Sequence, residues 1–276
     1  MRGEFVDLGV TRLYYYAAGT RGAGEPVIFL HGFPASSQLW HGVVREMPEG
    51  HRVVVVDLLG FGKSDRPALA SLSATAHADR LKLVMDDLGI DAACVVGHGM
   101  GGAIAQAIAL NAPSRVTRLC LVNSTGFDAW PRGAARIARM LAAIPALGRA
   151  AGAPLLAGLV HGSLLKGFAD EQGGRHALDN YLRAFTMRLG VDALVSQLRA
   201  IRDPTVAALG ARLAGIAQPT SIVWGARDPW LDLRTGEMLR DAIPGATLDV
   251  IPDAGHFSPE DAPALVAAAV GRLLEK

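Results

Sequence analysis

The chain alternates between short continuous apolar runs and longer segments whose apolar residues recur at helical spacing. Continuous runs of this length are typical of strands buried on both faces of a parallel sheet. After two short strands within residues 4–17, we expect strands at 26–30, 52–56, 93–96, 118–122, 219–224 and 247–251. Helices are expected at 36–47, 73–88, 100–110 and 262–274. The alternation predicts an α/β fold, with a mostly parallel eight-stranded sheet and helices on both of its faces.

The alternation of strands and helices stops after the strand at 118–122. Residues 127–213 contain no convincing strand and are dominated by Ala, Leu, Arg and Gly. We expect them to form a helical cap over the carboxyl edge of the sheet. The core domain is then expected to consist of residues 1–126 and 214–276. Helices of the cap are predicted near 134–143, 150–166, 173–189 and 191–201.

Charge and composition narrow the classes of partner. The 276 residues carry 27 Lys and Arg against 26 Asp and Glu, a formal net charge of +1. This balance offers no basic excess for binding nucleic acid. The chain contains neither a run of about 18 apolar residues nor an apolar leader at its start, so we expect no membrane span and a cytoplasmic location. Cys94 and Cys120 both lie within apolar strands, which predicts buried free thiols.

The most informative stretch is Gly97-His98-Gly99-Met100-Gly101, where an apolar strand is followed at once by a helix. A strand that turns this sharply into a helix can carry a nucleophile in a Gly-x-Ser-x-Gly pattern. The outer glycines of that pattern are present as Gly97 and Gly101. The central position, where the nucleophile would stand, is Gly99.

Three other strand ends carry residues that could take part in catalysis. His31-Gly32-Phe33-Pro34 follows the first apolar run, Asp228 follows the strand at 219–224, and His256 follows the last strand. Binding and catalytic sites of open α/β sheets form at the carboxyl ends of the strands. The order along the chain is nucleophile position, acid and histidine, which is the order of the hydrolytic triad on this type of sheet.

On these four motifs the chain resembles the α/β-hydrolase superfamily over nearly its whole length. Its cap and motifs are most similar to the branch that holds small esterases, lactonases, haloalkane dehalogenases and epoxide hydrolases. The resemblance implies that His256 is the catalytic histidine and Asp228 the acid that orients its imidazole. It also implies an oxyanion hole made by the backbone amides of Phe33 and Met100. His31, Asp57, Ser64 and His98 match structural positions of the motifs.

The chain departs from the family at Gly99, which has no side-chain atom to attack a substrate. The missing nucleophile is either Ser, for acyl transfer, or Asp, for epoxides and alkyl halides. His31-Gly32-Phe33-Pro34 is often seen in the Asp group. That group's halide-binding members usually have Trp where this chain has Met100, and its epoxide hydrolases usually need two cap tyrosines, whereas only Tyr181 lies in the predicted cap. These two differences favour Ser.

Three functions remain open at this point. The first is a hydrolase of a small uncharged ester or lactone that lacks its nucleophile. The second is an enzyme in which the His256–Asp228 dyad acts as a general base on water or on an acidic substrate proton, in water-mediated hydrolysis, elimination, decarboxylation or cyclisation. The third is a ligand-binding protein without catalysis.

The remaining expectations concern ligands. Trp130, Phe168 and Phe257 are predicted to line the substrate pocket. The chain shows no Cys/His cluster with metal-ligand spacing and no dinucleotide-binding context for its glycines. We therefore expect no metal and no cofactor, and a small molecule as the partner. The sequence does not indicate an oligomeric state.

Overall fold

The computed structural model describes residues 3–19, 24–67, 71–127, 153–183, 185, 197 and 203–276. Its eight strands form one sheet in the order β1-β2-β4-β3-β5-β6-β7-β8. They are β1 (Gly3–Asp7), β2 (Arg12–Ala18), β3 (Val27–Leu30), β4 (Val53–Val56), β5 (Ala93–His98), β6 (Val116–Val122), β7 (Thr220–Gly225) and β8 (Thr247–Ile251). β2 pairs antiparallel with both β1 and β4, and every other pairing is parallel. The predicted mostly parallel eight-stranded sheet is confirmed.

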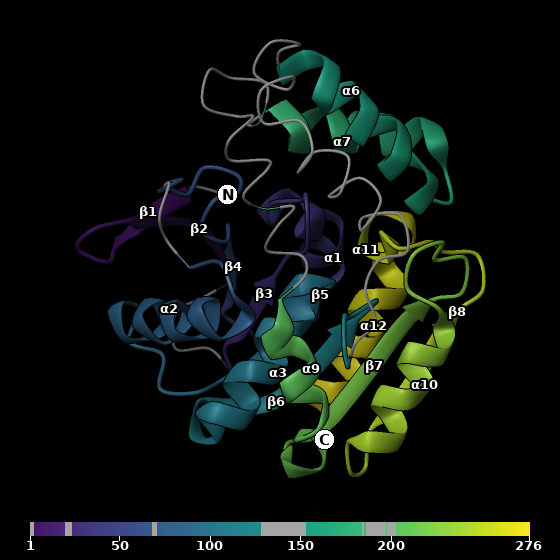
Figure 1. Cartoon of the computed structure of the whole chain (residues 1–276). Coiled ribbons are helices and arrows are strands. Elements are labelled where there is room, and N and C mark those ends of the chain that lie inside the picture. Colours follow the sequence, from purple (N-terminus) through teal and green to yellow (C-terminus); the bar gives the residue numbers. More distant parts are fainter. Residues whose placement is uncertain are drawn as a thin grey trace.

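Helices cover both faces of this sheet (Figure 1). α1 (His41–Glu46) packs on α12 (Pro263–Leu274) on one side, and α2 (Ala74–Asp87) packs on α3 (Met100–Asn111) on the other. The expected helix at 36–47 is divided into a 3-10 turn, η1 (Ser37–Trp40), and α1. Three helices that the sequence pattern did not predict are α9 (Pro204–Gly210), α10 (Leu233–Ala242) and α11 (Ser258–Asp261). A short 3-10 turn, η2 (Pro113–Arg115), leads into β6.

The chain between β6 and β7 contains only helices as regular elements wherever it is described. These are α6 (Ala153–Leu164), η3 (Leu165–Gly167), α7 (Glu171–Arg183), α9 and η4 (Leu213–Gly215). Figure 1 places α6 and α7 together, outside the layers that flank the sheet. The helices expected near 134–143 and 191–201 lie outside the described residues, apart from Gln197, which is helical. We call this segment the β6–β7 insertion, and its boundaries as a cap domain stay a prediction.

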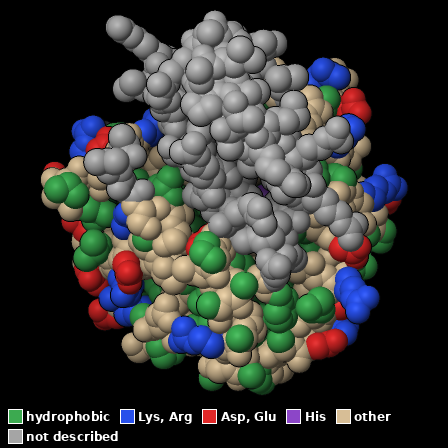
Figure 2. Space-filling model, in the orientation of Figure 1, with side chains coloured by type: hydrophobic (Ala, Val, Ile, Leu, Met, Phe, Trp, Pro, Cys, Tyr) green, Lys and Arg blue, Asp and Glu red, His purple; other side chains and the backbone are tan. Residues whose placement is uncertain are grey.

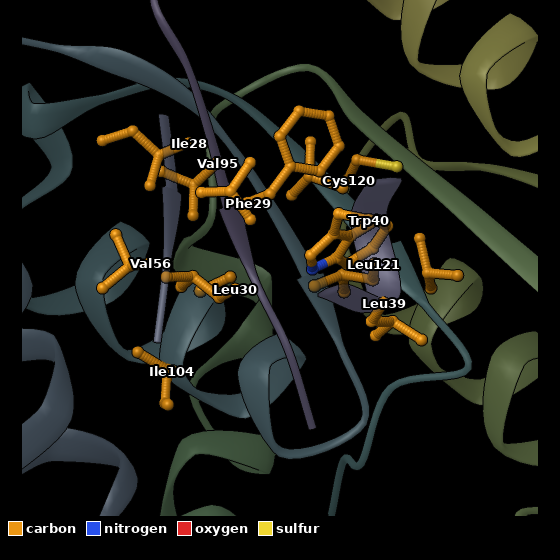
Figure 3. Close-up of a cluster of buried hydrophobic side chains, with 14 of the residues drawn as sticks. Ile28, Phe29, Leu30, Leu39, Trp40, Val56, Val95, Ile104, Cys120 and Leu121 are labelled. Atoms are coloured by element: carbon orange, nitrogen blue, oxygen red, sulfur yellow. The ribbon is translucent and has the colours of Figure 1, made fainter. Parts of the chain in front are cut away.

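The core is built from the central strands, whose residues are buried on both faces. All four residues of β3 are fully buried. Because side chains alternate across a strand, Phe29 packs on Trp40 of η1, with ring centroids 4.9 Å apart, while Ile28 and Leu30 point to the face that α3 covers with Ile104 (Figure 3). Cys94 and Cys120 are free and buried in β5 and β6, as predicted.

The surface carries both signs of charge. On the face drawn in Figure 2, acidic and basic side chains are interspersed around the described part of the chain. This agrees with the net charge of +1. No helix among the described residues is long and apolar enough to cross a membrane.

Candidate active site

The sharp turn predicted at Gly99 is present, and glycine suits it. β5 ends at His98, α3 begins at Met100, and Gly99 between them has φ 55° and ψ −118°. This left-handed conformation strains any residue with a Cβ. Gly97 and Gly101 are required by close packing. A Cβ on Gly97 would overlap the Gly101 carbonyl, and a Cβ on Gly101 would overlap the Leu30 carbonyl.

The space above Gly99 differs from the space at these neighbours. A Cβ built on Gly99 would lie 3.6 Å from the Cα of Gly32 and 3.6 Å from Nε2 of His256. Both are ordinary van der Waals distances. The position therefore has room for a side chain and faces Nε2 of the His256 imidazole.

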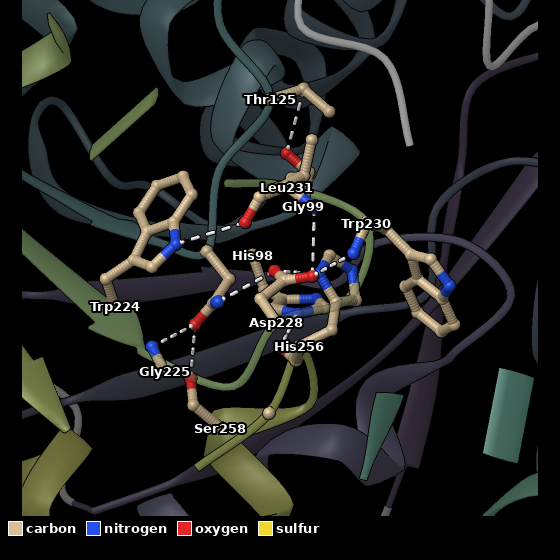
Figure 4. A network of polar contacts seen from close by, with 12 residues as sticks. His98, Gly99, Thr125, Trp224, Gly225, Asp228, Trp230, Leu231, His256 and Ser258 are labelled. Carbon is tan, nitrogen blue, oxygen red and sulfur yellow. Dashed lines mark hydrogen bonds and ion pairs between the residues drawn. The ribbon is translucent and has the colours of Figure 1, made fainter. Parts of the chain in front are cut away.

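The predicted histidine and acid come together in one hydrogen-bonded pair. Nδ1 of His256 lies 2.7 Å from Oδ2 of Asp228, and both side chains are almost completely buried (Figure 4). The other carboxylate oxygen accepts hydrogen bonds from the amides of Trp230 (2.9 Å) and Leu231 (3.0 Å). A carboxylate at Nδ1 fixes the tautomer, so that Nε2 faces Gly99 as a proton acceptor.

The net effect of these contacts is that Asp228 stays ionised. Burial raises the pKa of Asp228, but the charge of His256 and the hydrogen bonds from His256, Leu231 and Trp230 together lower it by more. The pKa of the Asp228 carboxyl therefore lies below its ordinary value. An ionised partner is what an imidazole needs in order to become protonated during a reaction.

Asn123 is a site residue that the sequence pattern did not reveal. Its Nδ2 donates to Oδ2 of Asp228 at 2.9 Å, while its Oδ1 accepts from the amide of Gly225 (3.0 Å) and the hydroxyl of Ser258 (2.8 Å). It follows β6 directly and has φ 39°, a conformation that Asn tolerates better than most residues. Its place at the carboxyl end of a central strand was the available signal.

The two amides predicted as oxyanion donors belong to Met100, which follows Gly99, and to Phe33, which follows Gly32, whose Cα lies 3.6 Å from a Cβ built on Gly99. Met100 is the first residue of α3, and Phe33 follows the His31-Gly32 pair after β3. Within the described part of the chain, neither amide donates a hydrogen bond to another protein group. Two amide donors without protein acceptors near one histidine are suited to hold a developing oxyanion.

His31 supports the loop that presents Phe33. Its Nδ1 donates to the Gly32 carbonyl at 2.9 Å, and its Nε2 accepts from the amide of Leu58 at 3.0 Å. Burial lowers the pKa of His31, which keeps the ring neutral and able to accept at Nε2. The ring therefore ties the Phe33 loop to the residues after β4.

His98 supports the loop that carries His256 in a similar way. Its Nε2 lies 2.9 Å from the carbonyl oxygen of His256, and the two rings are 4.7 Å apart between centroids. Burial, followed by the neighbouring His256, lowers the pKa of His98 to about 3. A neutral ring then donates its Nε2 proton to the carbonyl. Asp57 and Ser64 are likewise engaged with backbone groups, including the Ser64 hydroxyl donating to the Asp57 carbonyl at 2.6 Å.

Two of the three aromatic residues predicted for the pocket, Phe168 and Phe257, lie in the described part of the chain. Phe168 of the β6–β7 insertion stacks on Phe257 at 4.2 Å between centroids, and Phe257 lies 5.3 Å from the His256 ring. Both are buried, and their contact with substrate stays a prediction. Trp130 lies outside the described residues. Trp230, which was not predicted, is half-buried with its ring 4.9 Å from His256.

The β6–β7 insertion is joined to the loop that carries His256. The Gly167 carbonyl accepts from the amide of Phe257 at 3.1 Å, and the Asp261 carboxylate accepts from the amides of Ala169 (3.1 Å) and Gly255 (2.8 Å). These bonds fix the histidine loop from the insertion side. No group of three or more His, Cys, Asp or Glu among the described residues could hold a metal ion.

Comparisons with known proteins identify the family and support the fold. The family model described as "alpha/beta hydrolase fold" matches residues 25–263. A 2-hydroxymuconate semialdehyde hydrolase from Pseudomonas sp. (strain CF600) is 31% identical over 94% of this chain and 92% of its own. Haloalkane dehalogenase 2 of Mycobacterium tuberculosis is 30% identical over 97% of this chain and 93% of its own. A solved α/β hydrolase fold protein from Burkholderia ambifaria superposes with a TM-score of 0.85 at 28% identity, covering 98% of this chain and 99% of that one.

Proposed function

We propose that this chain, which belongs to the α/β-hydrolase fold family and has a haloalkane dehalogenase and a semialdehyde hydrolase among its relatives, binds a small uncharged ester or lactone and does not turn it over, because it lacks the nucleophile for a covalent intermediate. The observation that carries the proposal is the position of Gly99. It occupies the turn in the conformation of the elbow, opposite Nε2 of His256, and it has no atom that could attack a carbonyl carbon.

The choice of a carbonyl substrate over an epoxide is supported by the tyrosines. The chain has four, at positions 14, 15, 16 and 181. The first three belong to β2, and the hydroxyl of Tyr181 donates to the Glu260 carboxylate. None of the four hydroxyls forms a hydrogen bond with His256 or Asp228. A pair of amide donors, by contrast, suits a carbonyl that becomes an oxyanion.

A second candidate function rests on the dyad. His256 and Asp228 keep the tautomer of a general base, with Nε2 facing the open side of Gly99. In that reaction Nε2 takes a proton from water, and the hydroxide attacks the substrate carbonyl to form a C–O bond. The amides of Phe33 and Met100 hold the oxyanion. When it collapses, the bond to the leaving alkoxide breaks, and the imidazolium returns the proton to that alkoxide.

The experiment compares the chain as it stands with Gly99→Ser and Gly99→Ala on a panel of short-chain aryl esters and small lactones. The proposal predicts that Gly99→Ser gains at least about 10³-fold in turnover over both other forms, because a triad then activates a hydroxyl. Gly99→Ala controls for the added Cβ. Equal rates for all three forms would contradict the proposal.

A comparison of the unchanged chain with His256→Ala distinguishes the second candidate function from the first. If the unchanged chain turns over a substrate and His256→Ala abolishes that turnover, the dyad is the catalyst and the first proposal is wrong. A ligand-binding protein without catalysis would retain its affinity in His256→Ala and show no turnover in either form.

A further inference from the structure

A cavity lies between the core and α7. Its volume is about 300 Å³, which is at the lower end of the range for small-molecule sites. Gly99, Asp228 and His256 are absent from its lining. The core contributes residues of β2, of the segment around η1 and of the loop after β4, and the β6–β7 insertion contributes Asn180, Tyr181 and Arg183.

One lining residue presents a buried polar group without a partner. Tyr16 of β2 is 2% exposed, and its hydroxyl has no hydrogen-bond partner among the described residues. Burial, followed by the nearby charge of Asp57, raises the pKa of Tyr16 well above its ordinary value. The hydroxyl therefore keeps its proton and is available as a donor. Buried hydroxyls of folded proteins are nearly always paired, so this one points to a missing acceptor.

The charged residues of the cavity favour an acceptor with negative charge. Lys63 places its ammonium 4.5 Å from the centre of the Tyr14 ring and donates to the Tyr14 hydroxyl at 3.3 Å, which uses one of its three protons. Among the described residues it forms no ion pair. Arg183 supplies a second cation at the lining.

Asp57, the one carboxylate of the lining, is bound by backbone amides and leaves the two cations to a ligand. Asp57 is 1% exposed, and its two oxygens accept from the amides of Ser37 (2.6 Å) and Lys63 (2.8 Å). Its charge is thus held by backbone donors. The cavity then presents two cations and an unpaired hydroxyl donor.

We infer that this cavity is a second small-molecule site, which binds a small oxyanion, a carboxylate or a phosphate, through Lys63, Arg183 and the Tyr16 hydroxyl. The bound anion would contact the core and α7 at the same time and so join the insertion to the sheet. This site needs neither Gly99 nor the dyad. Its existence is independent of the reaction proposed above.

Isothermal titration calorimetry with succinate, inorganic phosphate and the neutral analogue succinamide tests the inference. We expect succinate or phosphate to bind one to one with a dissociation constant of about 1 mM or tighter, and succinamide not to bind. The anion that binds identifies the source of the charge as carboxylate or phosphate. His256→Ala is expected to bind it with unchanged affinity, which separates the cavity from the dyad.

Three variants assign the contacts. Lys63→Gln is expected to weaken binding about tenfold or more, and Tyr16→Phe several-fold, because each removes a donor to a charged acceptor. Lys82→Gln is the matched control, since Lys82 pairs with Asp79 on α2 away from the cavity and its removal should leave affinity unchanged. Tyr16→Phe should also raise the melting temperature of the ligand-free protein.

The inference is overturned if neither anion binds in this range, if succinamide binds as well as succinate, or if Lys63→Gln and Lys82→Gln have equal effects. Loss of binding in His256→Ala would overturn it too, because the anion would then occupy the site beside the dyad. Melting curves of all variants show whether each is folded before its affinity is compared.

Discussion

The backbone of Gly99 presents its open side to Nε2 of His256, and a Cβ built there would lie 3.6 Å from that nitrogen. In a hydrolase with a complete triad, the nucleophile's oxygen would stand in this gap. Asp228 holds the imidazole, Met100 follows Gly99 directly, and Gly32, the residue before Phe33, has its Cα 3.6 Å from the built Cβ. Chemistry at this site thus depends on what fills a space of one side chain.

The first prediction concerns the stability cost of filling that space. Gly99→Ala should lower the free energy of unfolding by about 1–3 kcal/mol, because φ 55° with ψ −118° is a sparsely populated backbone conformation, while the Cβ itself meets only ordinary contacts. Urea denaturation measures the loss. Gly245→Ala is the matched control, since Gly245 has φ 73° and no atom within 4 Å of a built Cβ. A loss at Gly99 much greater than at Gly245 would mean that the gap does not accept a Cβ.

The second prediction concerns Asn123 as a positioning residue. Asn123→Ala should lower the free energy of unfolding by roughly 2–4 kcal/mol, because it leaves the buried Gly225 amide and Ser258 hydroxyl without their acceptor. Ser258→Ala removes only one of these bonds and should cost clearly less. In the Gly99→Ser background, Asn123→Ala should lower kcat more than it raises KM, because it acts on Asp228 and not on substrate. Equal stability of both variants would count against this role.

The third prediction concerns acid stability. The pKa of Asp228 is lower in the folded protein than in the unfolded chain, so its contribution is present above the unfolded value of about 3.9 and is lost as the pH falls through the folded value. Asp228→Asn should therefore be less stable than the unchanged protein at pH 7, with a gap that narrows below about pH 4. Denaturation at several pH values measures the gap.

A control for that experiment is Asp253→Asn, which removes an exposed carboxylate on the neighbouring loop. Surface ion pairs of this kind contribute little, so its stability should follow that of the unchanged protein. A gap for Asp228→Asn that stayed constant with pH would contradict a lowered pKa for the folded Asp228 carboxyl.

The fourth prediction concerns the contact between α7 and α11. Burial raises the pKa of Glu260, although the Tyr181 hydroxyl donates to it and offsets part of the shift. A raised folded pKa means that ionisation opposes folding at neutral pH. Glu260→Gln keeps an acceptor for Tyr181 and should be more stable than the unchanged protein at pH 7. The advantage should disappear below about pH 4, and an advantage that persists there would refute the assignment.

The sequence predicted the fold well because burial on both faces leaves a direct mark on composition. Continuous apolar runs such as β3 and β4 allow few alternatives to a central parallel strand. The helices α9 and α11 were missed because they are short, with seven and four residues. The helix expected at 36–47 divides at Trp40, where Ser36 caps a 3-10 turn and α1 starts anew.

The dyad could be predicted because parallel strands bring their carboxyl ends to one edge, which joins Asp228 and His256 across 28 positions. The Asn123 contacts could not, because a lone Asn after a strand is compatible with many turns. The cavity proposed to bind an anion is lined by side chains from β2, the Lys63 loop and α7, which only the tertiary packing brings together. Its signal, the unpaired Tyr16 hydroxyl, exists only in the folded chain.

The most direct measurement of the central claim is labelling with a fluorophosphonate, followed by intact mass. We expect Gly99→Ser to gain a single covalent adduct, while the unchanged chain, Gly99→Ala and the double variant Gly99→Ser/His256→Ala gain none. That result would show that His256 activates a hydroxyl placed at this position and that Gly99 is where covalent chemistry is lost. An adduct on the unchanged chain, or an unlabelled but folded Gly99→Ser, would contradict the claim.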